Sequence, residues 1–383
     1  MEAIMKRQIF FAGFFLTFSA ALSYYVNSSF LKLLVGENRV GLVYAVAAVL
    51  AILIFTVHYL TRNFDLLKPS RFFGLILAGS YLGLSFIGGP VWLLLVFFIL
   101  IYVSVISLGL LLDLYLENLS RDQETGRIRG GYLTIINAAI LLAPLVSGST
   151  LGGSTSSVGG FQSVYLLCLA FTLPLLYQLF FKLKEARLPA TAITLYDKLL
   201  DKNLRQILKF DFLLNLFYFV MAIYLPIYLH GAIGFSWEKI GLILTIMLIP
   251  FILIDYPLGW LADKRWGEKE ILTVGLIITA LATLPIAWLT STNWLVWAGL
   301  LFATRVGASA WEAMKETYLF KRVNAGDIGV IGLSRLTAPA SYLVGALITF
   351  FLLKIIPLPH LFTILALIIL ASVGAGRKLV DMR

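Results

Sequence analysis

One arginine lies inside a long apolar stretch of this sequence, where a charge is costly unless it is paired or functional. Arg305 comes twelve residues after Asn293, the polar residue at which that stretch begins. In a helix that rises about 1.5 Å per residue, this places Arg305 about 18 Å deep, near the middle of a bilayer. A guanidinium at this depth stays protonated. We therefore expect either a structural role, as an ion pair with Glu312 two turns away or as support for helix packing, or contact with an anionic or strongly polar ligand.

A second group of ionisable residues lies nearer to one end of the apolar stretches. The group contains both signs, so one interpretation is a network of ion pairs that acts as a gate. The other interpretation is that one of its carboxylates carries a proton. The members are Asp113, Asp255, Glu312, Glu316 and Arg335.

Four polar side chains in the middle thirds of other apolar stretches are further ligand candidates. They are Tyr24, Tyr102, Asn137 and Tyr224. Each can form a hydrogen bond to a solute while the rest of the side chain packs against apolar neighbours. For each of them, ordinary helix packing is the alternative.

The elements that carry these residues are predicted to be membrane-spanning helices. Hydrophobic residues make up 60% of the chain and charged residues only 13%, whereas a soluble domain carries about 25% charged residues. Stretches of about 20 apolar residues are long enough to cross the hydrocarbon core. The sequence predicts an all-α polytopic membrane protein with twelve spans. They are 8–31, 40–60, 71–88, 91–115, 130–150, 161–181, 211–230, 240–261, 271–290, 294–317, 328–353 and 360–377.

The basic residues between the spans alternate by side. One side holds 23 Lys and Arg residues and the other side only four. By the positive-inside rule the richer side, which includes both termini, is cytoplasmic. The same asymmetry explains the net charge of +10 without a nucleic-acid partner. We expect a multi-pass protein in the lipid bilayer of a prokaryotic plasma (inner) membrane.

The longest polar segment, 182–210, separates a six-span half, 1–181, from a second one, 211–383. Leucines and lysines within this segment recur at helical spacing, which predicts an amphipathic helix on the cytoplasmic membrane face. Spans five and eleven each carry an Ala-Pro pair, ending at Pro144 and Pro339. These features indicate two distantly related, pseudo-symmetric halves, which is a common construction of secondary transporters.

The loop after the eighth span reads Gly-Trp-Leu-Ala-Asp-Lys-Arg-Trp-Gly-Glu-Lys over residues 259–269. It resembles the signature loop of the major facilitator superfamily, a Gly-x-x-(Ala/Ser)-Asp-(Arg/Lys) turn followed by glycine and basic residues. This copy has one extra residue before its second glycine, and Glu268 stands where a basic residue is common. The residues that match the loop are Gly259, Asp263, Lys264, Arg265, Gly267 and Lys269.

The resemblance implies a transporter of two six-helix halves that works by rocker-switch alternating access, with its substrate held at the midplane. It also implies that Asp263 accepts hydrogen bonds from a helix N-terminus of the other half, near Gly130, and so latches the inward gate. Spans one, four, five and seven, which carry the four polar ligand candidates, line the cavity in this family.

We therefore expect a secondary active or facilitative transporter of a small organic solute, anionic or amphipathic, with a coupling proton left open. A drug/proton antiporter-type exporter, a non-transporting membrane sensor or scaffold, and a polytopic lipid enzyme are the alternatives. The sequence contains no phosphate-binding loop of the Walker type and no familiar hydrolase motif, so we expect no enzyme. One cysteine and three scattered histidines predict neither disulfide nor metal, and we expect no cofactor and a monomer.

Overall fold

The computed structural model describes residues 2–60, 65–86, 89–118, 125–152, 158–186, 201–254, 257–258, 261–262, 266–322 and 328–376. Within these ranges every regular element is a helix. The chain forms two compact units, Met1–Ala190 and Thr191–Arg383, which are treated separately below.

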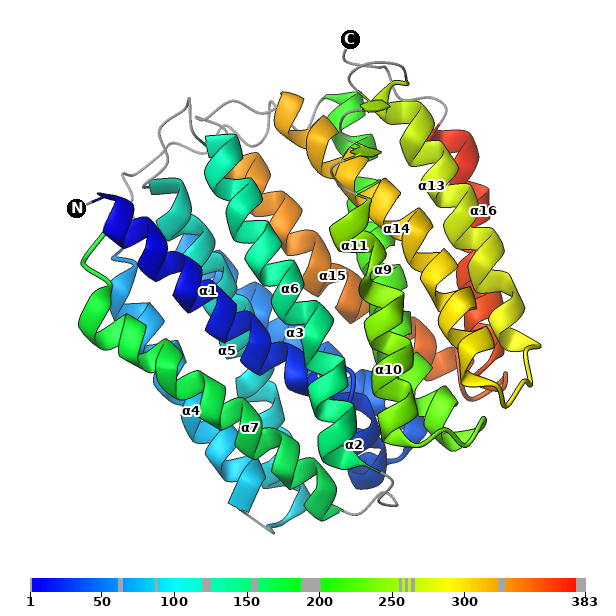
Figure 1. Cartoon of the computed structure of the whole chain (residues 1–383), viewed down its shortest axis with the longest axis horizontal. Helices are drawn as coiled ribbons and strands as arrows, with labels where there is room; N and C mark the ends of the chain where they lie inside the picture. Colours follow the sequence, from blue (N-terminus) through cyan, green and yellow to red (C-terminus); the bar gives the residue numbers. More distant parts are fainter. Residues whose placement is uncertain are drawn as a thin grey trace. The chain divides into compact units, whose positions relative to one another are not determined.

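In the first unit α1 is central, because it packs against α5, α6 and α7 (Figure 1). The helix α4 packs on α5 and α7, and α3 packs on α5. A π-helical turn, Gln178–Lys182, extends α7. The helices are α1 (Glu2–Tyr24), α2 (Asn27–Val35), α3 (Glu37–Leu60), α4 (Leu67–Phe86), α5 (Val91–Asn118), α6 (Thr125–Leu151) and α7 (Val158–Tyr177).

The first predicted span, 8–31, is not one straight helix. The axes of α1 and α2 differ by 45° across a turn at residues 25–26. Asn27, just after the turn, accepts a 2.9 Å hydrogen bond from the hydroxyl of Tyr165 on α7. Its amide nitrogen lies 3.4 Å from Oγ of Ser23, to which it donates. These polar contacts anchor the bend within the unit.

In the second unit α9 packs against α14, α15 and α16, and α14 also packs against α10, α11 and α13 (Figure 1). A short 3-10 helix, Leu284–Ala287, continues α13. The helices are α9 (Lys202–Gly231), α10 (Trp237–Leu248), α11 (Pro250–Leu253), α13 (Glu268–Thr283), α14 (Trp294–Arg322), α15 (Ile328–Leu352) and α16 (His360–Gly376).

The seventh span begins earlier than the predicted residue 211. The carboxylate of Asp201 accepts hydrogen bonds from the backbone nitrogens of Asn203, at 2.8 Å, and Leu204, at 3.4 Å. Such an N-cap satisfies donors that the first helical turn would otherwise leave open. Residues 202–210 of the predicted amphipathic segment are therefore the first turns of α9.

The helices α13 and α14 touch through glycine. A Cβ atom added to Gly307 would lie 2.5 Å from the backbone nitrogen of Thr279, and one added to Gly275 would lie 2.8 Å from the carbonyl oxygen of Gly307. Small residues allow membrane helices to approach this closely. The contact holds α14, the helix that carries Arg305 and Glu312, against α13.

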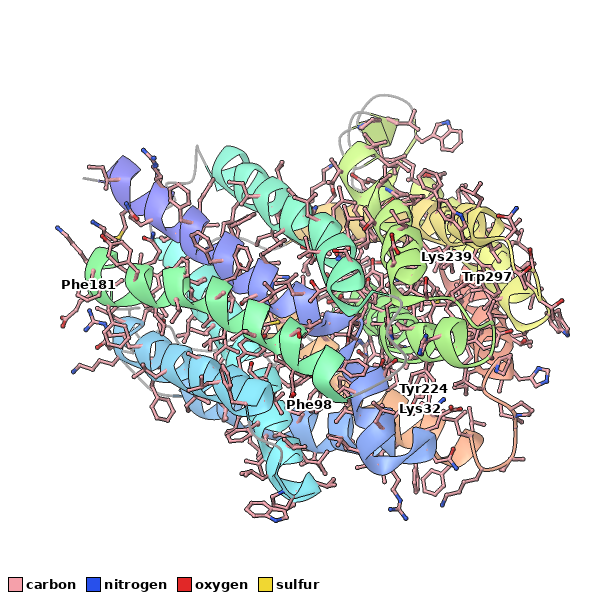
Figure 2. The ribbon with its side chains drawn as sticks, turned by 60° about the horizontal axis from the view of Figure 1, so that its bottom comes forward. Lys32, Phe98, Phe181, Tyr224, Lys239 and Trp297 are labelled. Carbon is pink, nitrogen blue, oxygen red and sulfur yellow. The ribbon has the colours of Figure 1, made fainter. Side chains whose placement is uncertain are left out.

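Seven described helices are long and apolar enough to cross a membrane, or eight if the bent pair α1–α2 counts as one span. Many large apolar side chains are exposed, as expected for a surface that faces lipid. Phe181, which is 76% exposed, is one of the side chains that lie outside the ribbon (Figure 2). The chain is an all-α, multi-pass membrane protein, and its described helices are consistent with the predicted layout of twelve spans in two halves.

Candidate functional site

Arg305 lies inside the second unit and is only 2% exposed. Its Cζ atom lies 4.9 Å from the ring centroid of Phe217 and 5.2 Å from that of Tyr218, both on α9. Its Nε and Nη1 atoms are buried and have no hydrogen-bond acceptor among the described residues. Buried donors are nearly always paired, and an unpaired one is costly. The two open donors therefore mark Arg305 as a place where an acceptor can bind.

Tyr218 connects Arg305 with Glu312. Its hydroxyl donates a 2.5 Å hydrogen bond to Oε2 of Glu312 on α14. The structure therefore places a tyrosine between Arg305 and Glu312, the ion-pair partner that was considered from the sequence. The guanidinium rests on the ring, and the carboxylate binds the hydroxyl of the same side chain.

A buried lysine organises the remaining charges of α14. Nζ of Lys315 lies 2.8 Å from Oδ1 of Asp211 on α9 and 2.9 Å from Oε1 of Glu316. Nη1 of Arg335 on α15 lies 4.0 Å from the same Glu316 oxygen. The carboxylate of Glu316 thus contacts both Lys315 and Arg335, and Glu316 and Arg335 are both predicted members of the charge network.

The carboxylate of Asp211 is surrounded by donors. Besides Lys315, it accepts hydrogen bonds from Ser334 at 2.7 Å, Thr337 at 2.9 Å and the side-chain nitrogen of Asn215 at 3.0 Å. Its side chain is buried, so these contacts replace the water that a carboxylate would otherwise bind. The cluster ties α9, α14 and α15 together.

Asp211 and Lys315 were not predicted from the sequence. Asp211 stands at the junction between the polar segment and the seventh span, where a charge is easily read as solvated. Lys315 follows Glu312 by three residues and precedes Glu316 by one. That spacing, together with the position of Asn215 four residues after Asp211, was the available signal for a polar helix face.

The other predicted ligand residues have different surroundings. Tyr224, on α9, is buried, and its hydroxyl shares a 2.8 Å hydrogen bond with Oγ1 of Thr349 on α15. In the first unit, Tyr24 is exposed at the end of α1, and Asn137 on α6 is half-buried. The ring centroid of Tyr102 lies 6.0 Å from that of Tyr44.

The two remaining members of the predicted charge group are Asp113 and Asp255. Asp113 is half-buried on α5, in the first unit. Asp255 lies outside the described residues. Within the second unit, the structure therefore brings together Glu312, Glu316 and Arg335.

Of the predicted signature loop, residues 261–262 and 266–269 are described. Gly259, Asp263, Lys264 and Arg265 lie outside the described residues. Gly267 precedes α13, and its backbone nitrogen donates a 3.1 Å hydrogen bond to Oε2 of Glu270. Nζ of Lys269 lies 3.4 Å from the other oxygen of Glu270.

Glu268, the residue that departs from the family pattern, is buried and paired. Its carboxylate accepts a hydrogen bond from Nζ of Lys321 near the end of α14. A carboxylate in the first turn of one helix and a cation in the last turn of another both complement the helix dipoles. The pair joins the start of α13 to the end of α14.

Comparison with known proteins identifies one matching family and several solved structures of similar fold. The sequence model of the Major Facilitator Superfamily matches residues 14–335. No curated protein matches the sequence.

Among solved structures, a mutant form of the nucleoside transporter NupG is similar with a TM-score of 0.74 and 13% identity, over 98% of this chain and 100% of that one. A D-xylose-proton symporter is similar with a TM-score of 0.73 and 14% identity, over 98% of this chain and 97% of that one. The peptide transporter POT in complex with sulfate is similar with a TM-score of 0.72 and 15% identity, over 98% of this chain and 95% of that one. At these identities the likeness concerns the fold.

Proposed function

The chain belongs to the Major Facilitator Superfamily, and on this premise we propose that it transports a small organic anion across the membrane by rocker-switch alternating access. The membership favours a secondary transporter over an enzyme. The proposal adds the class of solute and assigns Arg305 as its cationic contact.

The open donors of Arg305 carry this proposal. Phe217 and Tyr218 lie against the guanidinium, so partners of its N–H groups approach in the guanidinium plane. Nε and Nη1, the two unpaired atoms, belong to different edges of that plane. A carboxylate can accept two parallel hydrogen bonds from one such edge. An anionic group of this kind would satisfy a buried donor, Nε or Nη1, that the described protein residues leave without an acceptor.

A coupling proton is a second part of the proposal, and Glu312 is its candidate carrier. Glu316 is held by Lys315 and lies within reach of Arg335. Glu312 instead accepts its 2.5 Å hydrogen bond from the neutral hydroxyl of Tyr218. A carboxylate held by a neutral donor can lose its charge with less disruption than one held in ion pairs.

The organisation and orientation of the protein complete the proposal. The proposed halves, 1–181 and 211–383, are joined through 182–210, of which residues 202–210 are the first turns of α9. Both termini of the proposed arrangement lie in the cytoplasm of a prokaryotic cell. The resemblance of residues 259–269 to the signature loop supports a role of this loop in gating. The basic residues of the connecting segments support this orientation.

Thermal unfolding of the purified protein tests the proposed solute class. Benzoate, succinate and other organic carboxylates are compared with their uncharged amides, since a ligand that binds the folded state stabilises it. At about one hundred times its dissociation constant, a ligand adds about 2.7 kcal/mol. We expect stabilisation by one or more carboxylates but not by the matching amides, and loss of the effect in Arg305→Gln.

Lys354→Gln is the matched control. Nζ of Lys354 lies 4.1 Å from the ring centroid of Phe350 and 5.6 Å from that of Phe351. It is therefore another cation of the second unit that rests on two adjacent aromatic rings. Its replacement should leave the response to carboxylates unchanged. An equal response in Arg305→Gln and in the unaltered protein would contradict the proposal.

A further inference from the structure

Tyr218 contacts both groups that the proposed function uses. Its ring lies 5.2 Å from Cζ of Arg305, and its hydroxyl donates a 2.5 Å hydrogen bond to Glu312. The tyrosine comes from α9, whereas both charged residues come from α14. One side chain of a neighbouring helix therefore touches a cation through its ring and a carboxylate through its hydroxyl.

The two contacts affect each other because one conjugated ring makes both. A charged acceptor forms a stronger hydrogen bond than a neutral one. An ionised Glu312 therefore attracts the proton of the Tyr218 hydroxyl more strongly, which raises the electron density of the ring. The higher electron density strengthens the attraction between the ring and the guanidinium of Arg305. A protonated Glu312 does so less. The charge of Arg305 is then less compensated and more available to an anion.

The other charged groups around Glu312 are already engaged with one another. Asp211 on α9 and Glu316 on α14 both bind Lys315, and Arg335 on α15 lies near Glu316. In the described residues of α10 and α11, the charges lie in the first turn of α10, at 238–239. The described charges of α13 lie in its first turn, where Glu268 binds Lys321. Tyr218 is therefore the described contact that leads from Glu312 to Arg305.

We infer that Tyr218 is a positioning residue that makes anion binding at Arg305 and proton binding at Glu312 favour each other. The inference rests on the proposed function and adds the link between its two parts. A proton from water neutralises Glu312 and weakens the hold of the ring on Arg305, which then binds the anion more tightly. Linkage is reciprocal, so an anion at Arg305 also promotes protonation of Glu312. Anion and proton then cross the membrane together.

An infrared titration tests the link without a known substrate. The carbonyl band of the protonated Glu312 side chain is identified as the band that Glu312→Gln removes. The pH of half protonation is then measured in the unaltered protein, in Arg305→Gln, in Tyr218→Phe and in the double variant. Tyr218→Phe keeps the ring and removes only the hydroxyl. Should Arg305→Gln fail to fold, Arg305→Met replaces it.

A nearby cation favours the carboxylate form, so we expect Arg305→Gln to raise the pH of half protonation. In the Tyr218→Phe background the same substitution should have a smaller effect. The factor by which it changes the protonation constant of Glu312 should be smaller by about fivefold or more than in the unaltered protein. Tyr224→Phe is the matched background. It removes another hydroxyl of α9, one whose partner is the neutral Thr349. In the Tyr224→Phe background, Arg305→Gln should raise the pH of half protonation as much as it does in the unaltered protein.

Equal effects of Arg305→Gln with and without the Tyr218 hydroxyl would overturn the inference. A reduction of the same size in the Tyr224→Phe background would overturn it as well, because the link would not be specific to Tyr218. Failure of the proposed function appears in a different measurement. If Arg305→Gln keeps its stabilisation by carboxylates, Arg305 is not the anion contact, whatever the infrared result.

Discussion

The hydroxyl of Tyr218 donates a 2.5 Å hydrogen bond to Oε2 of Glu312. The same tyrosine ring lies against the guanidinium of Arg305, whose Nε and Nη1 atoms are buried without an acceptor among the described residues. In this arrangement the carboxylate is bound to a neutral group and the cation keeps open donors. Tyr218, and not a direct ion pair, therefore connects Arg305 with Glu312 in the described structure.

Arg305→Ala should leave a folded, monodisperse protein. Breaking a buried ion pair costs about 3–5 kcal/mol because it strands the partner charge. Arg305 instead rests on two rings, so its removal should cost clearly less than that range. The measurement is the unfolding temperature in detergent together with gel filtration. Two results together would indicate a structural ion pair instead. Arg305→Ala would be unstable, and the added substitution Glu312→Ala would restore stability with anion binding intact.

Lys315→Met should destabilise the second unit by about 3–5 kcal/mol, because it leaves the buried carboxylate of Asp211 without its cation. The double variant Lys315→Met/Asp211→Asn should recover most of the loss. Lys202→Met, an exposed lysine at the start of α9, is the control and should change stability by no more than about 0.5 kcal/mol. Equal stabilities of Lys315→Met and Lys202→Met would show that the buried pair contributes little.

Gly307→Ala should separate α13 from α14. The added Cβ would lie 2.5 Å from the backbone nitrogen of Thr279, which cannot rotate away as a side chain can. Overpacking of this kind costs about 1–3 kcal/mol. Gly299→Ala, on the same helix, meets nothing within 4 Å and should be tolerated. Thermal unfolding distinguishes the two, and similar unfolding temperatures would contradict the close contact.

The proposed topology predicts that cysteines at positions 154 and 202 are labelled from opposite sides of the membrane. The variants Ser154→Cys and Lys202→Cys are made in a background in which Cys168, the one native cysteine, is replaced. In intact cells a membrane-impermeant maleimide should react with the first variant only. Reaction of both from outside would reverse the assignment of the 182–210 segment to the cytoplasm.

The helical framework could be predicted from the sequence because apolar length and the positions of basic residues depend on local composition. The position of Arg305 within a long helix followed in the same way from its place in the apolar stretch after Asn293. Its neighbours Phe217 and Tyr218 did not, since they lie on α9 and contact Arg305 only through the packing of α9 and α14.

The bend in the first span was missed for a related reason. The turn at Tyr25 and Val26 contains neither glycine nor proline. What accompanies it is a contact between Asn27 and Tyr165 of α7, which is distant in sequence. Patterns within one span could not reveal a bend whose polar partner Tyr165 belongs to another helix.

Uptake into proteoliposomes tests the central claim most directly. The labelled solute is the carboxylate that stabilises the unaltered protein most strongly in thermal unfolding, and Lys354→Gln is the control. Arg305→Lys should transport with a raised KM, because it keeps the charge and loses the two-pronged geometry. Arg305→Ala should show no uptake above that of empty liposomes. Uptake by Arg305→Ala with the KM and rate of the unaltered protein would contradict the assignment of Arg305 as the contact for the transported anion.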